Sequence, residues 1–337
     1  MTIELGSLIE WSIKSLVIIM IILGGFAYTT LFERRTIARI QARIGPNRAG
    51  PGGLLQPVAD GIKLIFKEEL IPDRADKVLF ILAPIITVVP VLLLLAVIPL
   101  GPDIEVFGRQ ISLGLASDID VGLLFILAIA SISVYGIVIA GWSSYSKYSL
   151  MGGLRASAQM ISYELALGLA IVGPILLAGS MNVAKIVADQ QGLWYAILQP
   201  IGFLIFVVAA VAEINRAPFD MPEAEQELTA GYHTEYSGMK FALFFMAEYG
   251  KMIAISFIAA TLFLGGYWGP YVDRIGLLGP IYLFVKVGVV LFFMVWIRAS
   301  WPRLRYDRLM AFGWKILLPL ALLNVVITGG LIVVLNL

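Results

Sequence analysis

Eight stretches of about twenty apolar residues recur along this chain, and they constrain its fold more than any other feature. The hydrocarbon core of a bilayer is about 30 Å thick, so a helix needs about 20 apolar residues to cross it. Helices satisfy their own backbone hydrogen bonds inside the membrane, and no segment alternates like a barrel strand. We therefore predict membrane helices near residues 11–32, 78–100, 121–141, 158–179, 194–213, 240–264, 280–299 and 314–335.

Composition indicates the same fold class. Hydrophobic residues make up 60% of the 337 residues and charged residues 14%, and the mean hydropathy is +0.91. Soluble domains carry about 25% charged residues. We expect an all-α, polytopic membrane protein organised as a single integral membrane domain over residues 1–337.

Basic residues in the connections predict the orientation in the membrane. Three alternate connections carry only Arg109, Lys185 and Arg274 between them. Most loop lysines and arginines fall in the opposite set, which comprises residues 33–77, 142–157, 214–239 and 300–312. Connections rich in lysine and arginine stay in the cytoplasm, so both termini should lie on the outer, periplasmic side of the cell inner membrane. The first span has no basic segment before it and no small-residue cleavage site, so we expect it to be retained.

Missing residue types exclude several functions. The chain has no cysteine and one histidine, so it cannot ligate an iron–sulfur cluster or a bis-histidine haem. Neither a dinucleotide-binding glycine motif nor a Walker loop is present. We expect no metal site, no catalytic residue and no nucleic-acid partner. His233 is interpreted as an ordinary loop residue, with a proton relay as the lesser alternative.

The segment 212–238 crowds carboxylates between two apolar spans. Like-charge neighbours raise carboxyl pKa values, and this is typical of a site that handles protons. The alternative is a solvated acidic loop. The carboxylates are Glu213, Asp220, Glu223, Glu225, Glu227 and Glu235, set against Arg216 and His233.

Further ionisable residues fall within the predicted spans. Each full charge at mid-bilayer costs about 3 kcal/mol, so a group of them is rarely accidental. Glu164, Glu213 and Glu248 should lie in the cytoplasmic halves of their helices, where they could join the loop acids in one polar path. Lys251 follows Glu248 at i,i+3 spacing, and we expect these two to pair. The alternative is polar contact that only holds helices together.

Two connections carry amphipathic or basic character. Residues 54–68 place apolar side chains at helical spacing but are too short and polar to span, so we predict an interfacial helix on the cytoplasmic surface. This helix is either an anchor or the lip of an opening for an amphiphile. The segment 298–310 mixes arginines with aromatic residues, as in a topology anchor or a docking site for an acidic partner or a quinone head group.

Three segments carry a resemblance to a known family. RIGPNRAGPGGLLQPVADGIKL, EINRAPFDMPEAEQELTAGYHTEYSG and RASWPRLRYDRLM occur in this order among the eight spans. They closely resemble the NuoH family, a membrane subunit of respiratory complex I (NADH–quinone oxidoreductase), over essentially the whole chain. In that family the subunit joins the membrane arm to the peripheral arm and, with two peripheral subunits, encloses the quinone cavity.

The resemblance implies a function and a set of partners. The chain would couple reduction of a quinone, ubiquinone or menaquinone, to proton translocation. FMN and iron–sulfur clusters would belong to partner subunits. The partners would be peripheral-arm iron–sulfur and quinone-site subunits, small membrane subunits and antiporter-like subunits, all within the lipid bilayer.

The resemblance also implies roles for individual residues. The proton path would comprise Glu164, Glu213, Asp220, Glu223, Glu225, Glu227, Glu248 and Lys251. The quinone-binding residues would be Arg34, Arg35, Ala59, Lys63, Arg216, Phe219 and Arg298. The third span differs from some relatives, because it offers Ser131, Ser133 and Tyr135 where they place another acid.

Two alternatives remain at this point. The same fold serves as a subunit of membrane-bound hydrogenases and of ferredoxin- or F420-linked dehydrogenases, although the long GPNRAGPGGLLQP segment favours the quinone enzymes. An autonomous ion transporter is the second alternative, but its expected internal repeat is not seen between the two halves.

Overall fold

The protein is described by a computed structural model over residues 5–106, 109–220 and 231–335, in which helices predominate. A short antiparallel hairpin pairs β1 (Ile104–Val106) with β2 (Arg109–Ile111). Short 3-10 segments cover Pro51–Gly53, Leu95–Val97 and Gly231–His233, and a π-helical turn covers Gly313–Leu317. The α-helices are α1 (Leu5–Ile40), α2 (Gln56–Phe66), α3 (Lys77–Leu94), α4 (Gly122–Ser143), α5 (Lys147–Ala178), α6 (Val183–Asp189), α7 (Tyr195–Leu198), α8 (Pro200–Glu213), α10 (Gly238–Phe263), α11 (Leu278–Ser300), α12 (Tyr306–Phe312) and α13 (Leu318–Leu335).

The predicted membrane helices are confirmed by length and composition. Among the described residues, seven helices are long and apolar enough to cross a bilayer, and Pro200–Glu213 is a shorter apolar helix. The last span runs from α12 through the π-helical turn into α13 as Tyr306–Leu335. The protein is therefore an all-α, multi-pass membrane protein.

The predicted fifth span at 194–213 is not one continuous helix. It is divided at Gln199, whose backbone angles (φ −129°, ψ 63°) are not helical, into α7 and α8. Proline disfavours the helical conformation in the residue before it, and Pro200 begins α8. With 14 residues, α8 is about 21 Å long, less than the thickness of the hydrocarbon core.

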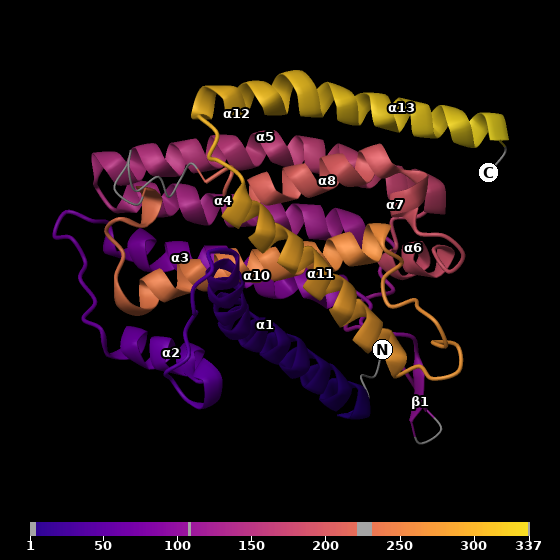
Figure 1. The fold of residues 1–337 in the computed structure, drawn as a ribbon, viewed down its shortest axis with the longest axis horizontal. Coiled ribbons are helices and arrows are strands. Elements are labelled where there is room, and N and C mark those ends of the chain that lie inside the picture. Colours follow the sequence, from indigo (N-terminus) through magenta and orange to yellow (C-terminus); the bar gives the residue numbers. More distant parts are fainter. Residues whose placement is uncertain (1–4, 107–108, 221–230, 336–337) are drawn as a thin grey trace.

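The long helices form a bundle around α10 (Figure 1). In the most apolar part of α10, 67% of the residues are buried inside the protein. Close approach of α3 and α4 depends on Gly136, because a Cβ there would lie 2.9 Å from the backbone nitrogen of Thr87. The start of α1 and the end of α13 lie toward the end of the bundle that carries the hairpin, and α2 lies toward the other end.

Helix α1 continues beyond the predicted span of 11–32 to Ile40. The added turns carry Glu33, which is buried, whereas Arg34 beside it is exposed. Glu33 follows the buried residues Ile22 and Thr29 at helical spacing, so it lies on the face of α1 that packs against the bundle. The Glu33 carboxylate at the end of this apolar span therefore faces the interior of the bundle.

Helix α2 is the predicted amphipathic helix, and it begins at Gln56 rather than at residue 54. None of its residues is buried by the rest of this chain. Arg34 of α1 donates to Asp60 of α2 over 2.7 Å, and Lys240 of α10 pairs with Glu69 just beyond α2. The helix is therefore held beside the bundle by its polar residues while its apolar side chains stay exposed.

Candidate functional site

A tight turn after α8 positions the centre of the candidate site. Gln159 of α5 donates to the carbonyl oxygens of Ala212 and Phe219, over 2.8 and 2.7 Å, and so clamps both ends of the turn. Within it, the amide of Phe219 donates to the carbonyl of Arg216 over 2.8 Å, and the Ala217–Pro218 peptide is cis. The turn holds the Arg216 side chain inside the protein, where it is 6% exposed.

Arg216 joins two carboxylates from different helices. Its Nη1 donates to both Oε atoms of Glu33, over 2.8 and 2.7 Å, and its Nε pairs with Glu248 of α10. Arg298 at the end of α11 also pairs with Glu33. The Arg216 guanidinium lies 4.2 Å from the centre of the Tyr249 ring, a distance at which cation–π attraction applies. The turn after α8 and three helices, α1, α10 and α11, thus meet at one buried charge network.

Electrostatics keep Arg216 charged despite its burial. Burial by itself would lower the pKa of Arg216, but the Glu248 and Glu33 carboxylates outweigh this cost and hold the pKa well above its ordinary value. Asp220, four residues on, behaves in the opposite way. Burial raises the pKa of Asp220, and the nearby Arg303 only partly offsets this effect. The turn therefore carries a permanent cation and a carboxyl group that holds its proton more firmly than usual.

A second ion pair lies deeper in the bundle. The Nζ atom of Lys251 on α10 lies 3.7 Å from Oε1 of Glu213 at the end of α8, and both side chains are buried. The predicted pairing of Lys251 with Glu248 is wrong. Although the two are neighbours on α10, Glu248 faces Arg216 and Lys251 faces Glu213, because each finds an opposite charge on another element.

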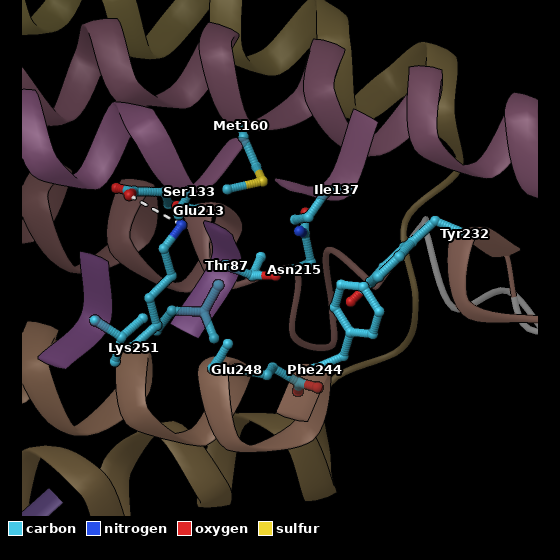
Figure 2. A pocket seen from close by; sticks show the side chains of 13 residues that line it. Thr87, Ser133, Ile137, Met160, Glu213, Asn215, Tyr232, Phe244, Glu248 and Lys251 are labelled. Atoms are coloured by element: carbon cyan, nitrogen blue, oxygen red, sulfur yellow. Dashed lines mark ion pairs between the residues drawn. The ribbon is translucent and has the colours of Figure 1, made fainter. Parts of the chain in front are cut away.

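A cavity of about 30 Å³ lies between the two ion pairs. Figure 2 shows Lys251 and Glu213 on one side of it and Glu248 on the other. A water molecule needs about 10–15 Å³ of such space, so the cavity has room for about two. Its polar wall includes Thr87, Ser133, Asn215, Glu213, Glu248 and Lys251.

Glu164 of α5 adds a carboxylate beyond the residues that line the cavity. Ser131 of α4 donates to the Glu164 carboxylate, and its hydroxyl also lies 3.0 Å from the carbonyl oxygen of Leu127. Glu164 is close enough to act electrostatically on both Glu213 and Lys251. Ser133 lines the cavity, whereas Tyr135 is 65% exposed. Ser131 and Ser133 of α4 thus lie next to these ionisable residues, whereas Tyr135 points away from them.

The residues predicted for proton transfer are brought together only in part. The structure gathers Glu213, Glu248 and Lys251 around one cavity, with Glu164 beyond them and Asp220 near Arg216. Glu223, Glu225 and Glu227 lie outside the described residues. Glu33 was not predicted as a site residue. Its place on the buried stripe of α1 would have indicated it, had the helix been extended beyond residue 32.

The residues predicted to bind quinone fall into two groups. Arg216 and Arg298 meet on Glu33, and the buried Phe219 packs in the same turn. The other four lie at the ends of α1 and α2. Arg34 and Lys63 share Asp60, Ala59 is exposed, and Arg35 donates to the carbonyl of Gly52.

Two further features concern the surroundings of His233 and possible metal ligands. Burial lowers the pKa of His233 to about 4, so the ring is neutral at ordinary pH. It lies among aromatic rings, parallel to that of Phe245 at 6.2 Å between centroids. Over the described residues, no group of three or more His, Asp or Glu side chains is placed to hold a metal ion.

Similarity to known proteins shows which family this chain belongs to. The family profile described as NADH dehydrogenase matches residues 13–329. A NuoH subunit of NADH-quinone oxidoreductase from Geobacter metallireducens is 54% identical over 94% of each protein, and one from Geobacter sulfurreducens is 53% identical over 94% of this chain and 93% of that protein. The NuoH subunit of Thermomicrobium roseum is 51% identical over 93% of each. The chain belongs to the NuoH family of NADH-quinone oxidoreductase subunits.

Membership of the NuoH family confirms the resemblance drawn from the three loop segments. The expectation that the chain is one subunit of a larger enzyme is also confirmed, because its family consists of enzyme subunits. The names of these three relatives are those of the quinone-linked enzyme rather than of a hydrogenase or a solitary transporter.

Proposed function

We propose that the chain forms part of the quinone cavity of a proton-translocating NADH–quinone oxidoreductase and couples quinone reduction to proton movement. The observation that carries this proposal is that two groups of ion pairs, Arg298, Glu33, Arg216 and Glu248 in one and Glu213 and Lys251 in the other, face each other across one small cavity. A membrane protein that brings this many largely desolvated ionisable groups close together bears a large desolvation cost, which function explains better than packing.

The order of the charges suggests how coupling works. A charge change at a quinone near Arg216 and Arg298 would alter the field on Glu33 and Glu248 first. Glu248 and Glu213 line the same small cavity, so a proton can pass between them through one or two water molecules. Glu164, held by Ser131, would take the proton farther along α5. Loss of the Glu213 charge should therefore lower the number of protons translocated per quinone reduced.

The redox groups would belong to other subunits. The relatives are named as quinone oxidoreductase subunits, and this chain has no cysteine to hold an iron–sulfur cluster. Quinone, ubiquinone or menaquinone, would be its substrate at an interface with peripheral-arm subunits that carry the clusters and FMN. Small membrane subunits and antiporter-like subunits would receive the protons or the coupled charge.

The exposed face of α2 would form the lip of the quinone opening. A bulky Ala59→Trp substitution is expected to raise the KM for long-tailed quinones several-fold more than that for short-tailed analogues, because only a long tail stays threaded through the opening. Ala59→Ser is the matched control, since it changes the side chain without adding bulk. Steady-state quinone reduction in membranes measures both. Equal loss with the two quinone types would mean that α2 is only an anchor.

We expect both termini to lie on the periplasmic side of the inner membrane, because the lysine- and arginine-rich connections lie at the opposite end and the seven long spans together with α8 make an even number of crossings. Alkaline phosphatase fused after residue 337 should be active, whereas a green fluorescent protein fusion at the same place should be dark. A fluorescent, phosphatase-negative pair would reverse the orientation.

A further inference from the structure

A basic pocket lies where α1 ends and the segment 41–54 turns back toward it. Its volume is about 520 Å³, and Arg35, Arg39 and Arg43 line it. A second pocket of about 290 Å³ shares Arg35, Arg39 and Leu54 with the first and continues along α1. Its remaining wall includes the aromatic and aliphatic side chains of Tyr28, Leu31 and Phe32. We call the two pockets together the α1 groove.

The α1 groove changes from apolar to basic along one helix face. Tyr28, Phe32, Arg35 and Arg39 recur at three- and four-residue spacing, so they form one stripe on α1, and Arg43 joins the basic end just after the helix stops. The apolar end lies within the membrane span and the arginines lie at its end, in the order in which a lipid presents its tail and its head. None of the described residues that line the two pockets is acidic. The groove therefore offers positive charge that none of its described lining residues neutralises.

The wall of the groove is fixed without a ligand. Gly53 has a φ of +84°, and a Cβ on it would lie 2.3 Å from the carbonyl oxygen of Pro46, so only glycine fits. The amide of Leu55 donates to the carbonyl of Ala49 over 3.0 Å, and Arg35 donates to the carbonyl of Gly52. Because the segment is closed on itself in this way, a ligand would not have to order it on binding.

We propose that the α1 groove binds one anionic glycerophospholipid. Its phosphate lies among Arg35, Arg39 and Arg43, and one acyl chain lies against Tyr28 and Phe32. Basic pockets at membrane helix ends attract anionic head groups, and arginine makes paired hydrogen bonds to phosphate. A quinone has a similar tail but no negative charge to match three arginines.

The lipid site meets the predicted quinone opening only at Arg35 and Leu54. Ala59 and Lys63 of α2 line neither pocket, and Arg34 points instead to Asp60 of α2. Only Arg35 was also expected to contact quinone. The lipid proposal therefore does not depend on the proposed coupling function.

Photolabelling of the intact enzyme complex tests this site. The complex is placed in phosphatidylcholine nanodiscs that contain a phosphatidylglycerol with a diazirine at its acyl-chain end, and labelled peptides are mapped by mass spectrometry. Label is expected on residues 28–32, with much less from a phosphatidylcholine probe carrying the same diazirine. Arg39→Gln and Arg43→Gln should each lower the labelling per assembled complex about fivefold. Arg48→Gln is the matched control, because Arg48 is exposed in the same segment but lines neither pocket.

Several outcomes would overturn the lipid assignment. Equal labelling by the two probes would remove the head-group preference, and an equal loss in Arg48→Gln would reduce it to general surface charge. Displacement by inorganic phosphate alone would mean that the arginines bind a free anion. Displacement by long-tailed quinone as readily as by unlabelled phosphatidylglycerol would mean that the groove holds quinone. The comparison of the two probes uses the unmodified complex, so it decides the question even if a variant fails to assemble.

Discussion

Replacing Arg216 by glutamine is expected to remove most of the assembled enzyme from the membrane. Arg216 is the partner of Glu33 and Glu248, and all three side chains are largely buried. Removing one member of a buried ion pair costs about 3–5 kcal/mol, because the remaining charge stays desolvated. A whole domain is stable by only about 5–15 kcal/mol, so the loss is a large fraction of the total. The amount of intact complex on native gels measures it.

Two further variants make the Arg216 result specific. Arg305→Gln is the matched control, because Arg305 pairs with Asp307 at the surface, where both side chains are more than half exposed, and such pairs contribute little. Glu33 keeps Arg298 as a partner in Arg216→Gln, so adding Glu248→Gln removes the carboxylate that has lost its cation and should restore part of the assembly. Wild-type amounts of complex in Arg216→Gln would show that the network does not stabilise the fold.

Glu213→Gln is expected to lower proton translocation at least about tenfold while quinone reduction by uncoupled membranes is retained. A positioned proton carrier contributes about a hundredfold or more to the rate of proton transfer, and glutamine cannot carry a proton. Glutamine keeps the volume of the side chain and can still accept a hydrogen bond from Lys251. A buried lysine, unlike an arginine, can also give up its proton when its partner charge is removed, so assembly should survive. Proton uptake into vesicles and quinone reduction, measured on the same membranes, give the ratio.

Two other glutamates separate a proton path from structural contact. Glu235→Gln is the matched control, because this carboxylate belongs to the same connection between α8 and α10 but does not line the cavity. Glu248→Gln should behave differently from Glu213→Gln, since it removes a partner of Arg216 and should lower assembly as well as pumping. An unchanged ratio of protons to quinone in Glu213→Gln would mean that Glu213 and Lys251 only hold α8 to α10.

The membrane helices could be predicted from the sequence because length and hydropathy are local properties. The amphipathic helix at 56–66 was predictable for the same reason, as its spacing is visible within a few turns. The break at Gln199 was missed because apolar residues on both sides of Pro200 hid it in the hydropathy pattern. Glu33 was missed because Arg34 and Arg35 beside it made the helix end look solvated.

The sequence by itself determined that this chain crosses the membrane many times, that it has no cysteine for a cluster and that acids gather after the fifth span. Only the tertiary structure decided which charges meet. Lys251 has Glu248 one turn away on its own helix, yet it pairs with Glu213 of α8, while Glu248 pairs with Arg216. A buried charge is stabilised by whichever opposite charge the packing brings within reach, and spacing along one helix does not reveal what other helices bring.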